Sequence, residues 1–378
     1  MAAGYHAPVR IVALGPDRLD DFLELPYALH GRDPLWIPPL RAAVRREVDG
    51  SSAFFRYGRL QAYLAEVDGR VVGRAAASIN PRMTDPDGGP VGQIGYFEST
   101  EDPAVAGGLF AAAEAWLREG GCRRVVGPMN GGIHRAHRLL VRGFERTPFL
   151  LEPRNPTYYP ALFEAHGYAV SARWYSYDVT RAQLEPVAAR LGRLCRSSRF
   201  RMQDLELSPA SVAHVHSLFD RVWAGHIGYA PMELEELLES VGALLPVMRM
   251  GELTTLVDPA GIEVGIGFAY PDWAAEVRAL AGDAGGWARW LGTPYPPRLI
   301  LHTVAMTPEV RGSRGSLVVL ARGIELVLRD PTTTEGVWAL SLDPSMPRLF
   351  AATREYALYE KSLQGGYGAS AQQRKPVE

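Results

Sequence analysis

Side chains able to accept a proton lie within or at the end of two apolar segments. His302 and Thr303 fall inside the segment 299–306, and Glu98 closes an earlier apolar segment. A neutral imidazole or a carboxylate can take a proton from an ammonium nucleophile. The alternative is that His302 has only a structural role and makes its hydrogen bonds within the protein. Adjacent residues of a strand point to opposite faces, so we expect only one of His302 and Thr303 to face a site.

A short turn of glycine, serine and arginine follows the segment 299–306 and precedes the helical pattern 317–329. Backbone N–H groups at such a helix N-terminus can bind a phosphate, and guanidinium and hydroxyl groups add further donors. An exposed polar turn is the alternative. The candidate phosphate contacts are Arg311, Gly312, Ser313, Arg314, Gly315 and Ser316.

Histidine and arginine gather in two further stretches. His134 and His137 are three residues apart, but no cysteine or carboxylate nearby completes a metal site, so we expect no metal and a polar, substrate-contacting loop. Four arginines (Arg135, Arg138, Arg142 and Arg146) lie in this stretch. The second stretch has helical spacing, which predicts either a solvated face or a contact for RNA phosphates. Its arginines are Arg190, Arg193, Arg196, Arg199 and Arg201.

Length and composition limit the class of protein. The chain has 378 residues, which favours two domains, and its net charge of −2 gives no general attraction to nucleic acid or membrane. Two cysteines cannot form a disulfide framework. No signal pattern or membrane-length apolar run is present, so we expect a soluble cytoplasmic protein without membrane partners.

The element pattern occurs twice. A hairpin over 59–77 turns at Asp68-Gly69, and residues 253–270 repeat it around a turn at 258–261. Strand, helix, strand and short helix follow in each half, which predicts α/β units with a partly parallel sheet. The expected ranges are 92–97, 103–119, 123–126 and 156–166, then 298–306, 316–328, 336–342 and 346–353.

This order resembles two tandem domains of the GNAT acyltransferase superfamily, and the segment 299–316 resembles the acyl-CoA pyrophosphate loop of that superfamily. The resemblance implies an α/β fold in which each domain has a mixed, partly parallel sheet flanked by helices. We expect the domains to meet around residues 181–201. The implied division is an N-terminal domain 1–180 without a donor loop, a basic linker helix 181–205, a C-terminal domain 206–363 and a flexible tail 364–378.

The resemblance also implies site residues, with departures. Val304 and Met306 lie on the strand against which the family places the donor pantetheine. Arg314 and Ser316 replace the two loop glycines of the family. Phe350 and Phe163 stand where family members often carry a Tyr proton donor, so Tyr356 is a candidate acid, with strand packing as the alternative. In the first half, the acidic residues of 98–103 would repel a pyrophosphate and fit a helix N-cap instead.

The resulting expectation is an N-acyltransferase that forms an amide between an acyl group of acetyl-CoA or another acyl-CoA and a small-molecule amine, as in natural-product biosynthesis. One alternative is a tRNA-dependent aminoacyl transferase, in which the arginines between the domains bind aminoacyl-tRNA. Another is a catalytically inactive acyl-CoA-binding or interaction module. The expected oligomeric state is a monomer or a homodimer.

Overall fold

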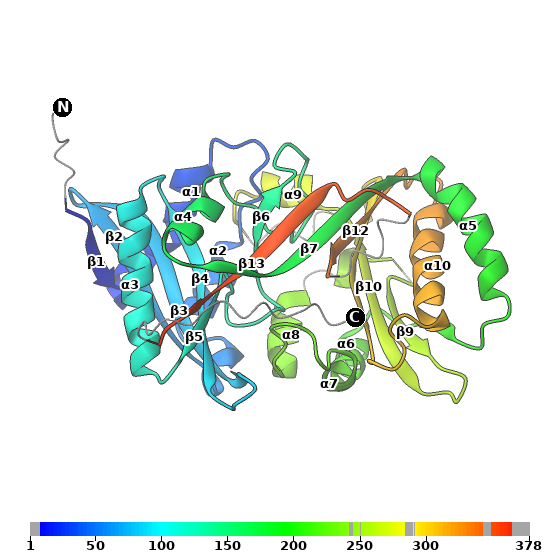
Figure 1. The fold of residues 1–378 in the computed structure, drawn as a ribbon. Coiled ribbons are helices and arrows are strands. Elements are labelled where there is room, and N and C mark those ends of the chain that lie inside the picture. Colours follow the sequence, from blue (N-terminus) through cyan, green and yellow to red (C-terminus); the bar gives the residue numbers. More distant parts are fainter. Residues whose placement is uncertain are drawn as a thin grey trace.

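The structure is a computed structural model that describes residues 8–241, 245–249, 251–283, 290, 292–342 and 349–364. In this part of the chain one 13-stranded sheet runs through both halves (Figure 1). Its strand order is β1-β2-β3-β4-β5-β13-β7-β12-β11-β10-β9-β8, with β6 paired to β13. The sheet is mixed, because β4 with β5 and β11 with β12 are parallel while the other paired strands are antiparallel.

The first half is a meander followed by a helical crossover. Its strands are β1 (Arg10–Ala13), β2 (Arg59–Val67), β3 (Arg70–Thr84), β4 (Pro90–Ser99), β5 (Arg124–Gly127), β6 (Leu139–Arg142) and β7 (Ala169–Thr180). Its helices are η1 (Pro16–Arg18), α1 (Leu19–His30), α2 (Arg41–Val48), η2 (Ala53–Arg56), α3 (Pro103–Glu119) and α4 (Tyr159–Ala165).

The second half repeats this plan. Its strands are β8 (Arg201–Asp204), β9 (Leu253–Val257), β10 (Glu263–Pro271), β11 (Arg298–Met306), β12 (Glu335–Ser341) and β13 (Arg354–Ser362). Its helices are α5 (Arg181–Cys195), α6 (Pro209–Ser217), α7 (Phe219–Val222), α8 (Leu234–Val241), η3 (Leu245–Val247), α9 (Ala274–Ala279) and α10 (Arg314–Arg329).

Local sequence signals account for most of these elements. The Asp68-Gly69 turn between β2 and β3 has positive φ at both residues, as a tight hairpin requires. Asp102 caps α3 by accepting a hydrogen bond from the N–H of Ala104, as expected from the acidic residues before Pro103. The expected helix 346–353 has no counterpart over 349–353, and residues 343–348 lie outside the described residues. The expected tail lies there too, apart from residue 364.

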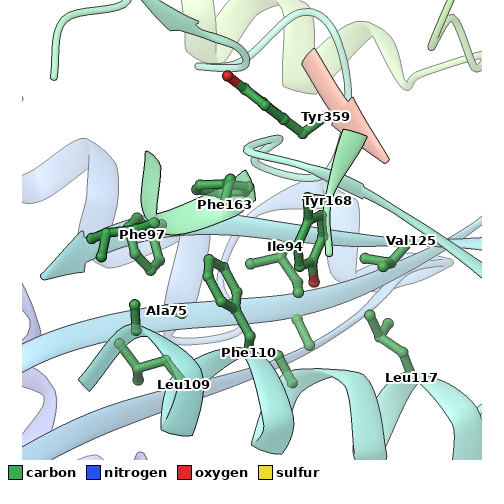
Figure 2. Packing of buried hydrophobic residues seen from close by; sticks show 14 of the residues in the cluster. Ala75, Ile94, Phe97, Leu109, Phe110, Leu117, Val125, Phe163, Tyr168 and Tyr359 are labelled. Atoms are coloured by element: carbon green, nitrogen blue, oxygen red, sulfur yellow. The ribbon is translucent and has the colours of Figure 1, made fainter. Parts of the chain in front are cut away.

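The two halves exchange their last strands. β7 leaves the first half and pairs with β12, while β13 returns from the second half and pairs with β5. β7 and β13 run antiparallel beside each other across the middle of the molecule (Figure 1). Tyr359 of β13 therefore packs in the core of the first half, its ring centroid 5.4 Å from that of Phe163 (Figure 2).

The expected meeting point of the halves at residues 181–201 is wrong. Helix α5 packs on α10 at the outer end of the molecule, and the junction is the β7–β13 pair instead (Figure 1). The reason is the strand exchange, which sequence periodicity does not report. The proposed domain division after residue 180 stays a prediction.

Candidate active site

Strand β11 separates from β12 halfway along its length. The parallel pairing covers Arg298–Leu301 against Glu335–Trp338 and stops there. The N–H of Thr307 donates to the carbonyl of Val264, so the alternation of an antiparallel ladder turns the backbone groups of Val304 and Met306 toward the β12 side. Val304 is 41% exposed. An extended ligand could therefore add to this strand edge through main-chain hydrogen bonds.

A β-bulge lies where the strands separate. The β10 partner of Thr303 is Phe268, but the next β10 residue, Ala269, pairs with Leu301, so His302 is the extra residue. His302 Nδ1 lies 2.9 Å from Thr303 Oγ1. The expectation that these two side chains point to opposite faces is thus wrong, because the bulge interrupts the alternation of side chains.

His302 is an uncharged imidazole at this point of separation. Burial first, and the nearby charge of Arg138 second, lower the pKa of His302 to about 4. Its ring lies 5.6 Å from the ring of Tyr270, centroid to centroid. Among the described residues, Nε2 of His302 has no recorded hydrogen-bond partner. This nitrogen is suited to accept a proton from a neutral nucleophile.

A loop of the first half, residues 127–138, carries Arg138, whose charge is one cause of the lowered pKa of His302. Arg138 donates from Nε to Nε2 of His137 over 2.8 Å, and its guanidinium carbon lies 4.5 Å from the centroid of the Trp174 ring. Nδ1 of His137 in turn lies 2.9 Å from the carbonyl oxygen of Arg135. Since Nε2 accepts, Nδ1 carries the proton and donates to that carbonyl. The loop thus holds the guanidinium of Arg138 against Trp174 of β7, and its expected contact with substrate stays a prediction.

The corresponding strand edge in the first half is occupied by protein. After β4 separates from β5, the N–H of Met129 donates to Ile94 over 2.8 Å, and the N–H of Tyr96 donates to Oδ1 of Asn130 over 2.8 Å. A Cβ on Gly95 would lie 2.5 Å from the carbonyl oxygen of Met129. The fully described segment 90–180 thus leaves β4 no free edge comparable to that of β11.

Glu98 belongs to a separate cluster in the first half. One of its oxygens lies 2.6 Å from Nε2 of His30 and accepts a hydrogen bond from the Tyr159 hydroxyl over 2.7 Å. Burial raises the pKa of Glu98, but His30, Arg74 and Tyr159 outweigh this, and the net shift is downward. The structure does not bring Glu98 to His302.

Tyr356 lies in the core instead of at the open edge of β11. It is fully buried, and its hydroxyl donates to Glu152, whose carboxylate also pairs with Arg354. Of the four candidate catalytic residues, the structure brings together His302 and Thr303.

Backbone N–H groups of the loop 311–316 that could bind a phosphate are hydrogen-bonded to hydroxyl groups of the same loop. Gly312 donates its N–H to the Ser316 hydroxyl over 3.1 Å, and Gly315 donates its N–H to the Ser313 hydroxyl over 3.0 Å. Arg311 donates to the carbonyl of Met306 and holds the 222–224 segment. The hydroxyl groups of Ser313 and Ser316 can rotate away and free these N–H groups for a ligand. The guanidinium of Arg311, in contrast, is already bonded to three carbonyl groups. A phosphate contact from this loop stays a prediction.

A cluster of aromatic and imidazole rings near this loop was missed from the sequence. The rings of His134 and Phe219 are stacked at 5.3 Å, and Trp223 lies 4.7 Å from His226, centroid to centroid. Ring nitrogens of His134, Trp223 and His226 are buried without a partner in the described part of the chain. The run of aromatic residues after residue 218 was the available signal, but its position beside the loop 127–138 depends on the fold.

The two arginine stretches have different environments. Arg135 pairs with Glu236 at 3.4 Å, and both side chains are buried. The arginines at 190, 193, 196, 199 and 201 are all exposed, and no acidic residue lies between Glu185 and Asp204. They do not form an interdomain face, because α5 is at the outer end. Arg314 reaches this end by donating to Ser197.

Solved structures with the same arrangement identify the fold. The chain is similar to a tandem GNAT protein from the clavulanic acid biosynthesis pathway, with 13% identity, 96% of this chain and 100% of that chain covered, and a TM-score of 0.53. The fold is the tandem GNAT fold. A probable N-acyltransferase from Enterococcus faecalis matches with 12% identity over 94% of this chain and 73% of that one, with a TM-score of 0.53.

Two other proteins are similar to this chain in sequence. The chain is 29% identical over 283 residues to the bacterial ceramide synthase of Caulobacter vibrioides, covering 73% of each chain. It is 24% identical over 373 residues to protein YghO of Escherichia coli, covering 93% of this chain and 94% of that one. No protein-family model matches.

The described residues show neither a membrane-spanning helix nor a cluster of metal-ligating side chains. None of their helices combines the length and apolar character needed to cross a bilayer. They also contain no group of three or more potential metal-ligating His, Cys, Asp or Glu side chains.

Proposed function

We propose that this tandem GNAT protein is an acyl-CoA-dependent N-acyltransferase whose donor binds along β11. The observation that carries the proposal is the contrast between the two strand edges. The β4 edge is filled by Met129 and Asn130, whereas in the described part of the chain β12 pairs with β11 only as far as Leu301 and leaves the β12-side backbone groups of Val304 without a strand partner. Amides of a pantetheine arm are suited to such an edge, since they can add to it as a strand does.

The chemistry needs a neutral amine next to an aligned thioester. The imidazole of His302 stays uncharged throughout the physiological range, because its pKa is about 4. It can therefore receive a proton as the amine attacks, although a low pKa makes it a weak base. The acid limb of a pH–rate profile would then report the pKa of the ammonium group of the acceptor and not the pKa of His302.

The acceptor we put first is a long-chain amino alcohol, and the donor a long-chain acyl-CoA. The similarity to a bacterial ceramide synthase supports this choice. Val304 and Leu342, three and four residues past the last pair between β11 and β12, are both exposed apolar side chains. Acetyl-CoA with a small amine is the competitor within the same chemistry.

The test measures release of free thiol from acetyl-CoA and long-chain acyl-CoA in the presence of small amines and long-chain amino alcohols. Val304→Pro is the informative variant, because it removes an N–H that no strand uses among the residues the structure describes. We expect kcat/KM for the acyl-CoA to fall tenfold or more, while Val304→Ala stays within threefold of wild type. Absence of CoA binding at millimolar concentration would refute the proposal and favour an inactive module.

Aminoacyl-tRNA is the second candidate donor, favoured by the row of exposed arginines on and after α5. RNA binding through these residues would weaken steeply with salt, with a log–log slope of about −0.7 to −0.9 per phosphate contact. Charge reversal at Arg190, Arg193 and Arg196 should then weaken binding of charged tRNA and flatten the slope. No tRNA shift by wild type at low salt removes this candidate.

A further inference from the structure

Among the residues that the structure describes, none supplies a carboxylate partner to the guanidinium of Arg138. Its recorded side-chain hydrogen bond goes to the uncharged His137, and its face lies over Trp174. Nη1 is buried and has no hydrogen-bond partner in the described part of the chain. Arg138 also has a φ of 73°, which is uncommon for a residue with a side chain and shows that the surrounding structure holds it there.

Arg138 lies beside the part of β12 that has separated from β11. Its guanidinium carbon is 4.5 Å from the ring centroid of Trp174 on β7, and the next β7 residue, Tyr175, pairs with Ser341, three residues past the last β12 residue that pairs with β11. In agreement with this position, the charge of Arg138 is one cause of the lowered pKa of both His302 and His137. The groups that act on Arg138 include Tyr356, whose hydroxyl is already bonded to Glu152. No recorded ion pair neutralises Arg138 among the described residues. A fixed cation in a poorly solvated place is suited to stabilise negative charge that develops during a reaction.

We propose that Arg138, supplied by the first half of the chain, stabilises the oxyanion formed at the thioester carbonyl on β11 of the second half. This rests on the proposed acyl-CoA-dependent function. The amine nitrogen forms a bond to the carbonyl carbon, and the π electrons move to the oxygen, which Arg138 faces. The amine proton passes to Nε2 of His302. Collapse re-forms the carbonyl and breaks the C–S bond, and the thiolate leaves and takes up that proton.

The first test is steady-state kinetics of Arg138→Gln in the full-length protein with the acyl-CoA and amine that wild type uses. Loss of an oxyanion donor should lower kcat by about 100-fold or more and leave both KM values within about threefold. Arg138→Lys, which keeps the charge, should recover part of the loss. Arg146→Gln is the matched control, since it removes the same charge from an exposed residue paired with its neighbour Glu145.

A second readout is independent of turnover. Titration of His302 by NMR in Arg138→Gln should show a higher pKa than in wild type, because the neighbouring positive charge is gone. Unchanged kcat in a folded Arg138→Gln protein would overturn the inference and leave the proposed function standing. A raised acceptor KM with unchanged kcat would overturn it too, since Arg138 would then bind an anionic group of the acceptor. Inactivity of wild type with every thioester would refute both.

Discussion

At the scale of the residue, the molecule keeps several ionisable side chains uncharged or tightly paired around its centre. His134 and His302 are neutral because burial lowers the pKa of each to about 4. Arg354 lies between Glu152 and Asp178, at 3.0 Å and 2.8 Å, where three strands and a loop meet. These arrangements make the middle of the sheet sensitive to acid.

One part of this acid sensitivity can be assigned to His134. In the unfolded chain His134 has a pKa near 6.5, so as pH falls from 6.5 to 4 the unfolded state binds a proton that the folded state excludes. The free energy of unfolding should therefore fall, by about 3 kcal/mol at pH 4 from this residue. His134→Phe, which keeps the ring on Phe219, should remove that part of the pH dependence.

The measurement is urea denaturation of wild type and His134→Phe at several values between pH 4 and pH 7. The carboxylates titrate in both proteins, so the difference between the two curves isolates His134. Parallel curves over this range would contradict the assignment.

At the scale of the element, one glycine in each of the helices α5 and α10 allows the effect of helix propensity to be measured apart from the effect of side-chain packing. Gly192 lies inside α5, and a Cβ there would meet nothing within 4 Å, whereas a Cβ on Gly323 of α10 would lie 3.0 Å from the Trp338 ring and 3.2 Å from Leu301. One helix faces solvent at its glycine. The other uses its glycine to approach the sheet.

Alanine substitutions at these glycines should therefore have opposite effects. Gly192→Ala is expected to stabilise the protein by about 0.5–1 kcal/mol, because alanine costs less backbone entropy in a helix. Gly323→Ala is expected to destabilise it by about 1 kcal/mol or more through overpacking. Thermal denaturation of both variants beside wild type decides this, and stabilisation by Gly323→Ala would show that the α10 contact is looser than described.

At the scale of the whole molecule, strand exchange makes each half depend on the other. β13 covers β5, and Tyr359, Ala357 and Leu363 complete the core of the first half. β7 covers β12 in return. The intact protein should then unfold in one cooperative transition, with calorimetric and van't Hoff enthalpies that agree.

Expression of residues 1–180 alone gives the complementary measurement. Without β13, this fragment exposes the β5 edge and loses part of its core, so we expect no dispersed amide spectrum for it. A well-dispersed spectrum from the isolated fragment, or two separate calorimetric transitions of the intact chain, would show that the halves are independent.

The sequence by itself determined the local elements and their repetition. The Asp68-Gly69 hairpin, the capped helix that starts at Pro103 and the strand 298–306 all appear at or near their predicted bounds, because turn residues, N-caps and apolar periodicity act over a few neighbouring positions. The sequence also singled out His302, Thr303 and the stretch that contains His134 and His137 as candidates.

Tertiary structure alone decided what these residues meet. The bulge at His302 placed its side chain on Thr303, and the packing of loop 127–138 gave Arg138 its position near β11 while closing the edge of β4. The exchange of β7 and β13 moved the junction of the halves from 181–201 to the middle of the sheet. Each of these outcomes depends on pairing between segments far apart in the chain, and such pairing leaves no local pattern to be read.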